Sequence, residues 1–402
     1  MKKRDAAEGV YQCQGLGAKE RRMFSFFSPQ AIHFGRGQSR QTAALARAFG
    51  KSVLVVHGAT AARADWLLQS CKAASLTVKT ESCQTEPSLP DIEAALSRLA
   101  DYRPDVVIAV GGGSVIDFAK ALAALLPNPR PPLNYLEGVG GGQPLETAPI
   151  PMIALPTTAG TGAEVTKNAV ISVPEHAVKV SLRDPRMVPQ IAIVDPDLMQ
   201  AAPKSIVLAA GLDAITQVIE PYLSVKSNPM TDALCLAAIP VGLRVLRDLV
   251  EKDRPQAWDG MAWVSTCGGL ALANAGLGAV HGFAGVIGGK TNAPHGEICG
   301  ALLPAVLNSH LGKAKPETEI YRRIQWVQGV IDAHFADGKA GAGIPALARW
   351  SKGQGLRGVA DMGLPQRDHS DVADAAAKAS SMKGNPFSLS KEDLLEILKA
   401  AQ

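Results

Sequence analysis

"DVVIAVGGGSVIDFAKALAALL", residues 105 to 126, runs from a short apolar stretch through three glycines into an apolar segment of helical length. A strand, a tight turn and a helix in this order are typical of a βαβ unit and predict a parallel sheet. Gly111, Gly112 and Gly113 leave the backbone bare, and Ser114 follows where a helix begins. Unpaired N–H groups and the helix dipole favour a phosphate there. The spacing is not GxGxxG, so these residues alone fit a purely structural turn equally well.

The segments around this unit repeat the alternation. Strand patterns at 52–58 ("SVLVVHG") and 76–83 ("LTVKTESC") precede segments of helical length, and a helix is predicted over 89–102. Beyond about residue 200 the strand signal gives way to long Ala/Leu-rich stretches, the last of which, "SLSKEDLLEILKAA", has Ser390 as a helix cap. The Gly/Pro-rich segment 127–144 is expected to be a loop within the first domain.

This pattern predicts an α/β N-terminal domain, Rossmann-like and built on a mostly parallel sheet, followed by an all-α C-terminal domain. We expect the α/β domain over residues 23–195 and the helical domain over 196–402. Residues 1–22 mix charge, Gly and Ala without apolar periodicity, and we expect them to be a disordered leader.

Composition narrows the class of protein. The 402 residues are 47% hydrophobic and 19% charged, with a net charge of only +4 and no basic block interleaved with aromatics, so nucleic acid is not an expected partner. We find no apolar run of the roughly 18 residues that span a bilayer, and no membrane is expected as a partner. Six scattered cysteines without a disulfide spacing fit free thiols in a reducing cytoplasm. A small metabolite is the expected partner.

A second turn strengthens the case for a nucleotide. "ALPTTAGTGAEVTKNAVI", residues 154 to 171, again leaves a strand pattern and offers Thr157, Thr158 and Thr161 beside two glycines. Alone, it fits a threonine-rich turn whose hydroxyls are satisfied locally. Two turns that each combine bare backbone with hydroxyl groups favour a dinucleotide.

A candidate metal site comes from the second half. "GLDAITQVIEPYLS", residues 211 to 224, has the pattern of a buried helix on which Asp213 and Gln217, one turn apart, share a face. His281 and His295 lie 14 residues apart among small and apolar neighbours. Each alone fits a hydrogen-bonded core histidine. Together with a buried Asp, they make a donor set suited to Fe(II) or Zn(II).

The motifs "GGGSVIDFAK", "LPTTAGTGAEVTKNAVI", "GLDAITQVIEPYLS…NPMTDAL" and "GLGAVHGFAGVIGG…PHGEICGALLP" together resemble the iron-containing alcohol dehydrogenase family, which includes maleylacetate reductases. The resemblance implies a dehydroquinate synthase-like architecture, with NAD(P) on the α/β domain, a divalent metal on the helical domain, and an alcohol, aldehyde or ketone between them. It leaves a homodimer open. The cofactor contacts that we expect are Gly111, Gly112, Gly113, Ser114, Asp117, Thr157, Thr158, Thr161, Asn168 and Lys179.

The resemblance also assigns the metal ligands, and here the chain departs from the family. Asp213, His281 and His295 match three of four ligand positions, but the fourth, usually His, is Gln217. A neutral amide oxygen binds Fe(II) or Zn(II) less well than imidazole, which predicts a weakened or absent metal site. With metal, the ion would polarise the carbonyl. Without it, His281 or His295, oriented by Asp213, would donate the proton. Gly285, four residues after His281, occupies a position where many members of the family have a second histidine.

Three classes of function remain open from the sequence. The first is an NAD(P)-dependent alcohol dehydrogenase or carbonyl reductase. The second is a dehydroquinate synthase-like lyase or cyclase that uses NAD without net redox change, and the third is an inactive nucleotide-binding descendant. Gly58 occupies the position where NAD-preferring members tend to have Asp, which predicts that NADPH is accepted.

Overall fold

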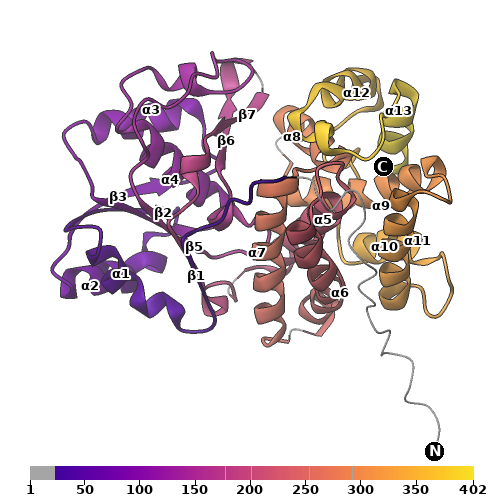
Figure 1. The fold of residues 1–402 in the computed structure, drawn as a ribbon, viewed down its shortest axis with the longest axis horizontal. Helices are drawn as coiled ribbons and strands as arrows, with labels where there is room; N and C mark the ends of the chain where they lie inside the picture. The colour runs from indigo at the N-terminus through magenta and orange to yellow at the C-terminus, as the bar shows by residue number, and fades with distance from the viewer. Residues whose placement is uncertain (1–22, 177, 201, 253, 292) are drawn as a thin grey trace, which may run out of the picture.

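The computed structural model describes residues 23–176, 178–200, 202–252, 254–291 and 293–402. An α/β part and a helical part lie side by side along the long axis of the molecule (Figure 1). The predicted fold class is confirmed, since among the described residues all strands of the sheets end by Val194 and helices follow from Lys204. The expected leader, residues 1–22, lies outside the described residues.

Six parallel strands form the main sheet, in the order β1-β8-β5-β4-β2-β3. Every residue of β4 and β5 is buried, as the continuous apolar runs predicted for central parallel strands. After β2 the chain continues to β3 on one side of β2 and then to β4 on the other side. The strand order therefore reverses between β2 and β4. Open α/β sheets bind ligands at the carboxyl ends of the strands at such a topological switch point. The strands are β1 (Ala31–Phe34), β2 (Ser52–Gly58), β3 (Thr77–Cys83), β4 (Val106–Gly111), β5 (Met152–Pro156) and β8 (Ile191–Val194).

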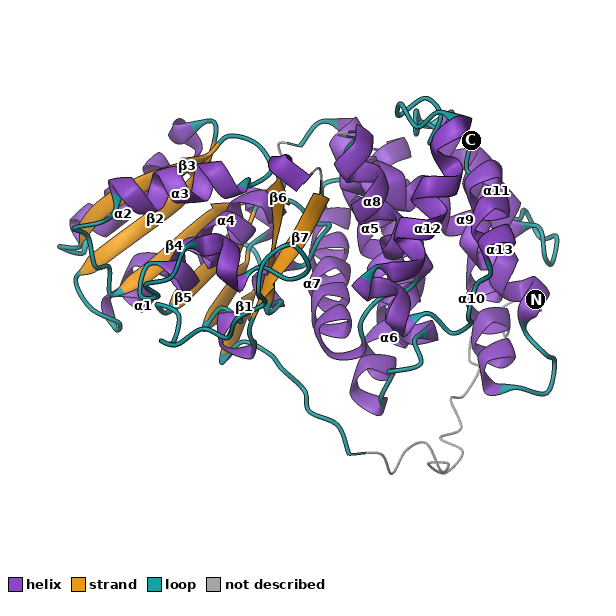
Figure 2. Ribbon diagram, turned by 90° about the horizontal axis from the view of Figure 1, so that it is seen from above, coloured by secondary structure: helices purple, strands orange, loops and turns teal. Residues whose placement is uncertain are grey.

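Helices cover both faces of this sheet, on its two sides in Figure 1, while Figure 2 looks onto one face. Alternating residues of β2 separate the two layers, since Val53 and Val55 pack with α1 (Thr42–Arg47) and α2 (Asp65–Ala73). Leu54 and Val56 pack instead with α3 (Leu89–Arg98) and α4 (Gly113–Leu125). A separate antiparallel hairpin, β6 (Asn168–Val173) and β7 (Val178–Arg183), packs against α8 (Ala279–Thr291) of the helical part.

The other helices of the helical part surround α5 (Lys204–Leu223), in which every residue from Gly211 to Leu223 is buried. α5 could cross a membrane by length and composition, contrary to the expectation from the sequence, but 89% of its apolar window is buried inside the protein, as in the core helix of a globular protein. The helices are α5 (Lys204–Leu223), α6 (Pro229–Lys252), α7 (Ala257–Ala275), α8 (Ala279–Thr291), α9 (His295–Lys313), α10 (Glu319–Phe335), α11 (Gly343–Gly353), α12 (His369–Lys378) and α13 (Lys391–Ala400).

Helix ends follow local chemistry. Ser390 caps α13 as predicted, in a capping box with Asp393. The long glycine-rich stretch 260–289 is helical but broken: α7 ends before Gly276, which has φ 70°, and α8 leaves at an angle of 100°. This bend sets the direction of the helix that begins just before His281.

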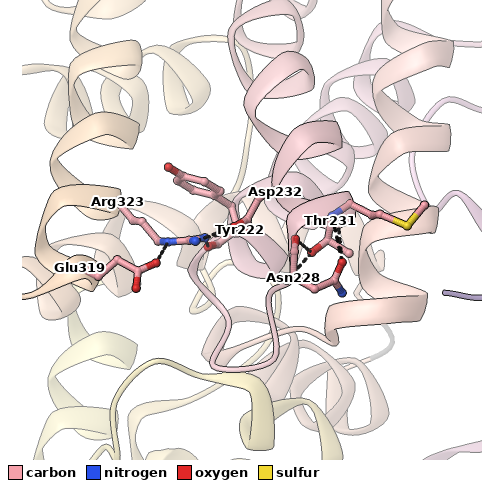
Figure 3. Close-up of polar contacts among 7 residues, drawn as sticks. Tyr222, Asn228, Thr231, Asp232, Glu319 and Arg323 are labelled. Atoms are coloured by element: carbon pink, nitrogen blue, oxygen red, sulfur yellow. Dashed lines mark hydrogen bonds and ion pairs between the residues drawn. The ribbon is translucent and has the colours of Figure 1, made fainter. Parts of the chain in front are cut away.

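An arginine of α10 fixes the C-terminal end of α5 (Figure 3). Arg323 pairs with Asp232 at 2.5 Å and donates to the backbone carbonyl of Tyr222 at 2.8 Å. Asn228 begins α6 by accepting a hydrogen bond from the backbone N–H of Thr231 at 3.1 Å. The "NPMTDAL" motif therefore serves to hold α5, α6 and α10 together.

The two parts meet backbone to backbone at a pair of glycines. Gly162 follows β5 with φ +60°, a conformation that side chains disfavour. A Cβ on Gly162 would lie 2.5 Å from the carbonyl oxygen of Ser265 on α7, and a Cβ on Gly269 would lie 2.3 Å from the carbonyl oxygen of Gly162. The approach of α7 to the turn after β5 thus requires that both residues lack a side chain.

Gly269→Ala is expected to destabilise the protein by about 1–3 kcal/mol, because the new methyl group overpacks a contact between two backbones. Gly329→Ala, in the exposed middle of α10 with no atom within 4 Å of the new Cβ, is the matched control. There the helix propensity of Ala should stabilise by up to ~1 kcal/mol. Chemical denaturation measures both, and equal stabilisation of the two variants would contradict the close contact.

Candidate active site

The two glycine-containing turns lie side by side. β4 and β5 are neighbours that pair Gly111 with Pro156, and the backbone N–H of Thr157 donates to the carbonyl of Gly111 at 2.9 Å. Both turns therefore leave the sheet at one edge, next to the switch point. The structure brings together the residues that the sequence assigned to one dinucleotide.

The glycines fit against the threonines. A Cβ on Gly112 would lie 3.3 Å from Thr158 Oγ1, and a Cβ on Gly113 would lie 2.7 Å from Thr161 Oγ1. Gly112 is the N-cap of α4 and supplies no side chain to cap it. The first N–H groups of this helix are thus placed as an anion site would need them.

Two charged residues of α4, the partly buried Asp117 and the buried Lys120, tie this helix to the start of β6. Asp117 Oδ2 accepts a hydrogen bond from the backbone N–H of Val170 at 3.0 Å, and burial raises the pKa of Asp117 to about 6. Lys120, fully buried, donates to Thr166 Oγ1 at 2.7 Å and to the carbonyl of Asn168 at 3.1 Å, and burial lowers its pKa to about 8. The sequence prediction missed Lys120, although its spacing from Asp117 was a signal.

Lys179 reaches from the hairpin toward the helical part. Its Nζ forms an ion pair with Glu86 and lies 3.3 Å from where a Cβ on Gly288 of α8 would stand. Lys179 is thus in contact with both parts, as expected of a residue that lines a cleft between them.

A cavity of about 780 Å³ lies at the ends of β2 and β3. His57, Ser82, Cys83, Thr85, Asp91 and Arg98 are among its lining residues. None of the predicted cofactor contacts lines it, but it adjoins the glycine turn, because Cys83 Sγ donates to the carbonyl of Ser114 at 3.6 Å.

The predicted metal ligands converge in the helical part. Asp213 of α5, His281 of α8 and His295 of α9 meet, with His281 Nε2 3.3 Å and His295 Nε2 3.9 Å from Asp213 Oδ1. Asp213 is buried, and its Oδ1 has no hydrogen-bond partner within the described residues. A buried carboxylate oxygen that makes no hydrogen bond and faces two imidazole nitrogens is a donor arrangement that suits a divalent cation. The side chain of His295 is 39% exposed and forms the open side of the cluster.

Glu220 was missed by the sequence prediction. Its Oε2 accepts a hydrogen bond from His281 Nδ1 at 2.6 Å and its Oε1 one from the backbone N–H of Val280 at 2.7 Å. A carboxylate on the second ring nitrogen fixes the ring and turns Nε2 toward the ligand position, as around metal-bound histidines. Glu220 lies seven residues after Asp213 on α5, so the helical repeat was the signal that could have found it.

Gln217 and Cys299 also border this cluster. The Gln217 amide nitrogen donates to the carbonyl of Gly160 at 3.2 Å, while its Oε1 is buried and unpaired within the described residues. Cys299, one turn after His295 on α9, has its Sγ 3.8 Å from His281 Nε2. The ligand atoms of Asp213, His281, His295 and Cys299 all lie within 4.8 Å of one another.

Opposite charges hold the cluster together. Burial alone would raise the pKa of Asp213, but the facing His281 and His295 lower it below its usual value. Burial opposes a charge on His295 as well, yet Cys299 and Asp213 raise its pKa to about 9. The pKa of His281 is raised well above its usual value in the same way, despite burial.

Family models match both parts of the chain. Residues 29–196 match the model described as "Iron-containing alcohol dehydrogenase", and residues 207–402 match "Fe-containing alcohol dehydrogenase family, C-terminal". The chain belongs to the iron-containing alcohol dehydrogenase family. The resemblance inferred from the motifs is thereby confirmed.

Individual relatives agree with this family. Lactaldehyde reductase of Escherichia coli (strain K12) is 34% identical over 78% of this chain and 81% of its own length. NAD-dependent methanol dehydrogenase of Bacillus methanolicus is 30% identical over 94% of this chain and 100% of its own. The crystal structure of a 1,3-propanediol oxidoreductase superimposes with a TM-score of 0.84 at 28% identity, covering 95% of this chain and 100% of the other. This chain is accordingly an NAD(P)-dependent oxidoreductase acting on CH–OH groups.

Asp117→Asn tests the burial of the α4 carboxylate. The pKa of Asp117 is about 6 in the folded protein and 3.8 ordinarily, so the folded state holds the proton more tightly than the unfolded state does. The stability that this protonated carboxyl contributes is complete below about pH 3.8 and is lost as the pH rises through about 6. The free energy of unfolding of the variant should therefore rise relative to that of the wild type by about 1–3 kcal/mol between about pH 4 and about pH 7.

Denaturation of both proteins without cofactor measures this difference. Asp361→Asn, at an exposed position, is the matched control for loss of a carboxylate. A difference that is constant with pH, or that favours the variant toward acid, would contradict the raised pKa of Asp117.

Proposed function

We propose that the chain is an NAD(P)-dependent alcohol dehydrogenase, or a carbonyl reductase in the reverse direction, whose substrate lies between an α/β domain, 23–195, and a helical domain, 196–402. The observation that carries the proposal is the nearness of the paired turns to the cluster of Asp213, His281 and His295. Gln217, one turn after Asp213 on α5, donates from its amide nitrogen to the carbonyl of Gly160, in the turn after β5, at 3.2 Å.

The cofactor contacts that we propose surround the start of α4. The pyrophosphate would bind the bare backbone of Gly111–Gly113 and the hydroxyls of the facing turn, with the adenosine toward the cavity at the ends of β2 and β3. The nicotinamide end would then extend toward the helical domain. The full set is Gly111, Gly112, Gly113, Ser114, Asp117, Thr157, Thr158, Thr161, Asn168 and Lys179.

The residues present fit a divalent metal ion. Asp213 supplies a buried carboxylate oxygen that makes no hydrogen bond to the described residues, and His281 and His295 place imidazole nitrogens 3.3 Å and 3.9 Å from it. We propose these three as ligands, with Gln217 the fourth position by family resemblance. Such an ion acts as a Lewis acid toward a carbonyl oxygen, while the nicotinamide supplies or accepts the hydride.

The chain's own residues orient and enclose the substrate. Glu220 holds the His281 ring by its Nδ1–H, and the half-exposed His295 is the member of the cluster that a substrate oxygen can reach. His295 is therefore the residue that we propose to exchange a proton with the substrate when no metal assists. Gly285, one turn after His281, has no atom within 4 Å of a Cβ built on it, which leaves room for the substrate.

Absorbance of reduced nicotinamide tests the activity directly. A suitable panel of substrates contains small and long-chain alcohols, propane-1,3-diol and the aldehyde lactaldehyde. The names of the relatives refer to methanol, long-chain alcohols, 1,3-propanediol and lactaldehyde. We expect cofactor oxidation with aldehydes and reduction with alcohols. Substrate consumption without an absorbance change would favour a lyase, and cofactor binding without any turnover would favour an inactive descendant.

Gly112→Ala is expected to weaken nicotinamide dinucleotide binding by about 10-fold or more, because a methyl group narrows the approach of the pyrophosphate, and 10-fold corresponds to about 1.4 kcal/mol. Gly112 has φ −73°, which any residue adopts, so folding should persist. Calorimetric titration with NADH measures the change, with Gly329→Ala as the control. Unchanged affinity in a folded variant would remove the glycine turn from the cofactor site.

Gly58→Asp tests cofactor choice at the end of β2. A Cβ there meets only Val115 at 3.7 Å, an ordinary contact, so the variant should fold. The wild type should accept NADPH, and the new carboxylate should repel its 2′-phosphate and weaken NADPH binding by about 10-fold or more relative to NADH. Parallel titrations decide, and rejection of NADPH by the wild type would refute the inference from Gly58.

We further propose a cytoplasmic location and a homodimer. The described cysteines, Cys71, Cys83, Cys235, Cys267 and Cys299, are free and buried, as suits a reducing compartment. β1 is the edge strand of the sheet, and its Ile32 and Phe34 are exposed, which offers an apolar edge to a second copy.

A further inference from the structure

The geometry points to Cys299 as the fourth ligand of the metal centre, taking over from the imidazole that Gln217 replaces. The inference rests on the metal site of the proposed function and adds to it a sulfur donor. It concerns the identity of the ion and not the occurrence of hydride transfer.

Three ligand-atom distances in the cluster are close to those of a tetrahedral site. Bonds of about 2.0–2.3 Å to a central ion set neighbouring ligand atoms about 3.3–3.8 Å apart. Asp213 Oδ1 lies 3.3 Å and 3.9 Å from the two imidazole nitrogens, and Cys299 Sγ lies 3.8 Å from His281 Nε2. Because all four ligand atoms lie within 4.8 Å of one another, an ion can enter with shifts of about 1 Å or less.

Cys299 is held where its sulfur has to face the cluster. It is fully buried on α9, one turn after His295, so the two side chains share a face of the helix. Cys83 shows the alternative for a buried thiol, since its Sγ donates to the carbonyl of Thr85 at 3.0 Å. Cys299 is directed instead at an imidazole nitrogen, next to the unpaired Asp213 Oδ1.

Gln217 is less well suited to the role. Its amide nitrogen is bound to the carbonyl of Gly160, which anchors the head group to the turn after β5. Its oxygen is a neutral donor that suits harder ions. A carboxylate, two imidazoles and a thiolate form a donor set that favours Zn(II) over Fe(II).

Cobalt substitution tests the sulfur ligand. The full-length protein is stripped with chelator under reducing conditions and titrated with Co(II), whose thiolate bond gives a charge-transfer band in the near ultraviolet. We expect this band in the wild type, its loss in Cys299→Ser, and its retention in Cys267→Ser, the matched control on α7. Gln217→Leu should also retain it.

Zinc affinity provides the second measurement. Competition with a chromophoric chelator should give a loss of at least about 10-fold in Cys299→Ser, since even outer-shell changes cost 10–100-fold. Circular dichroism and thermal melting establish that the near-isosteric variant is folded.

The outcomes separate this inference from the proposed function. Cobalt bound without the band, or a band that survives in Cys299→Ser, would overturn the sulfur ligand and leave the metal site standing. No cobalt binding at all would overturn both the ligand and the metal site, while the absorbance assay with NADH would still decide whether the protein is a reductase.

Discussion

The helical part is organised around a buried negative charge. Asp213 lies in the middle of the core helix α5 with an oxygen that no described residue hydrogen-bonds, and an isolated charge in such a place costs several kcal/mol. Glu220 brings a second carboxylate two turns later, and His281 lies between the two, with one ring nitrogen facing each. α8 and α9 must approach α5 closely enough to deliver His281 and His295. Two features make that approach possible. They are the bend between α7 and α8 and the hydrogen bond from Arg323 to the carbonyl of Tyr222 at the end of α5.

The site depends equally on how the two parts are joined. The turn after β5 faces the glycine turn on one side, through Thr158 and Thr161, and touches α7 and Gln217 on the other. One segment of about six residues thus lies between the proposed cofactor site and the helix that carries Asp213. Such a segment joins the glycine turn to the helical part through direct contacts, without a long linker between them.

Local sequence was enough for much of the fold. The strand–glycine–helix order at 105–126, the continuous apolar strands and the Ser390 cap are short-range patterns, and the structure has each of them. The prediction missed three residues whose partners come from distant segments. Lys120 bonds Thr166, Glu220 bonds His281, and the Sγ of Cys299 lies beside Nε2 of His281. Periodicity aligned Glu220 with Asp213 and Cys299 with His295, but it could not say which residue would face them. The break at Gly276 was missed because a glycine within an Ala-rich helical pattern is ambiguous until its φ is known.

The glycine pair at the junction has a consequence for recombination within the family. Gly162 and Gly269 belong to different halves of the chain, and neither tolerates a neighbour with a side chain at the other position, because each Cβ would meet the opposite backbone. Two halves taken from different relatives should assemble as a chimera only where small residues meet at this point. The pair therefore restricts which α/β halves can replace the one in this chain. It also restricts which cofactor preferences this helical half can gain by recombination with relatives.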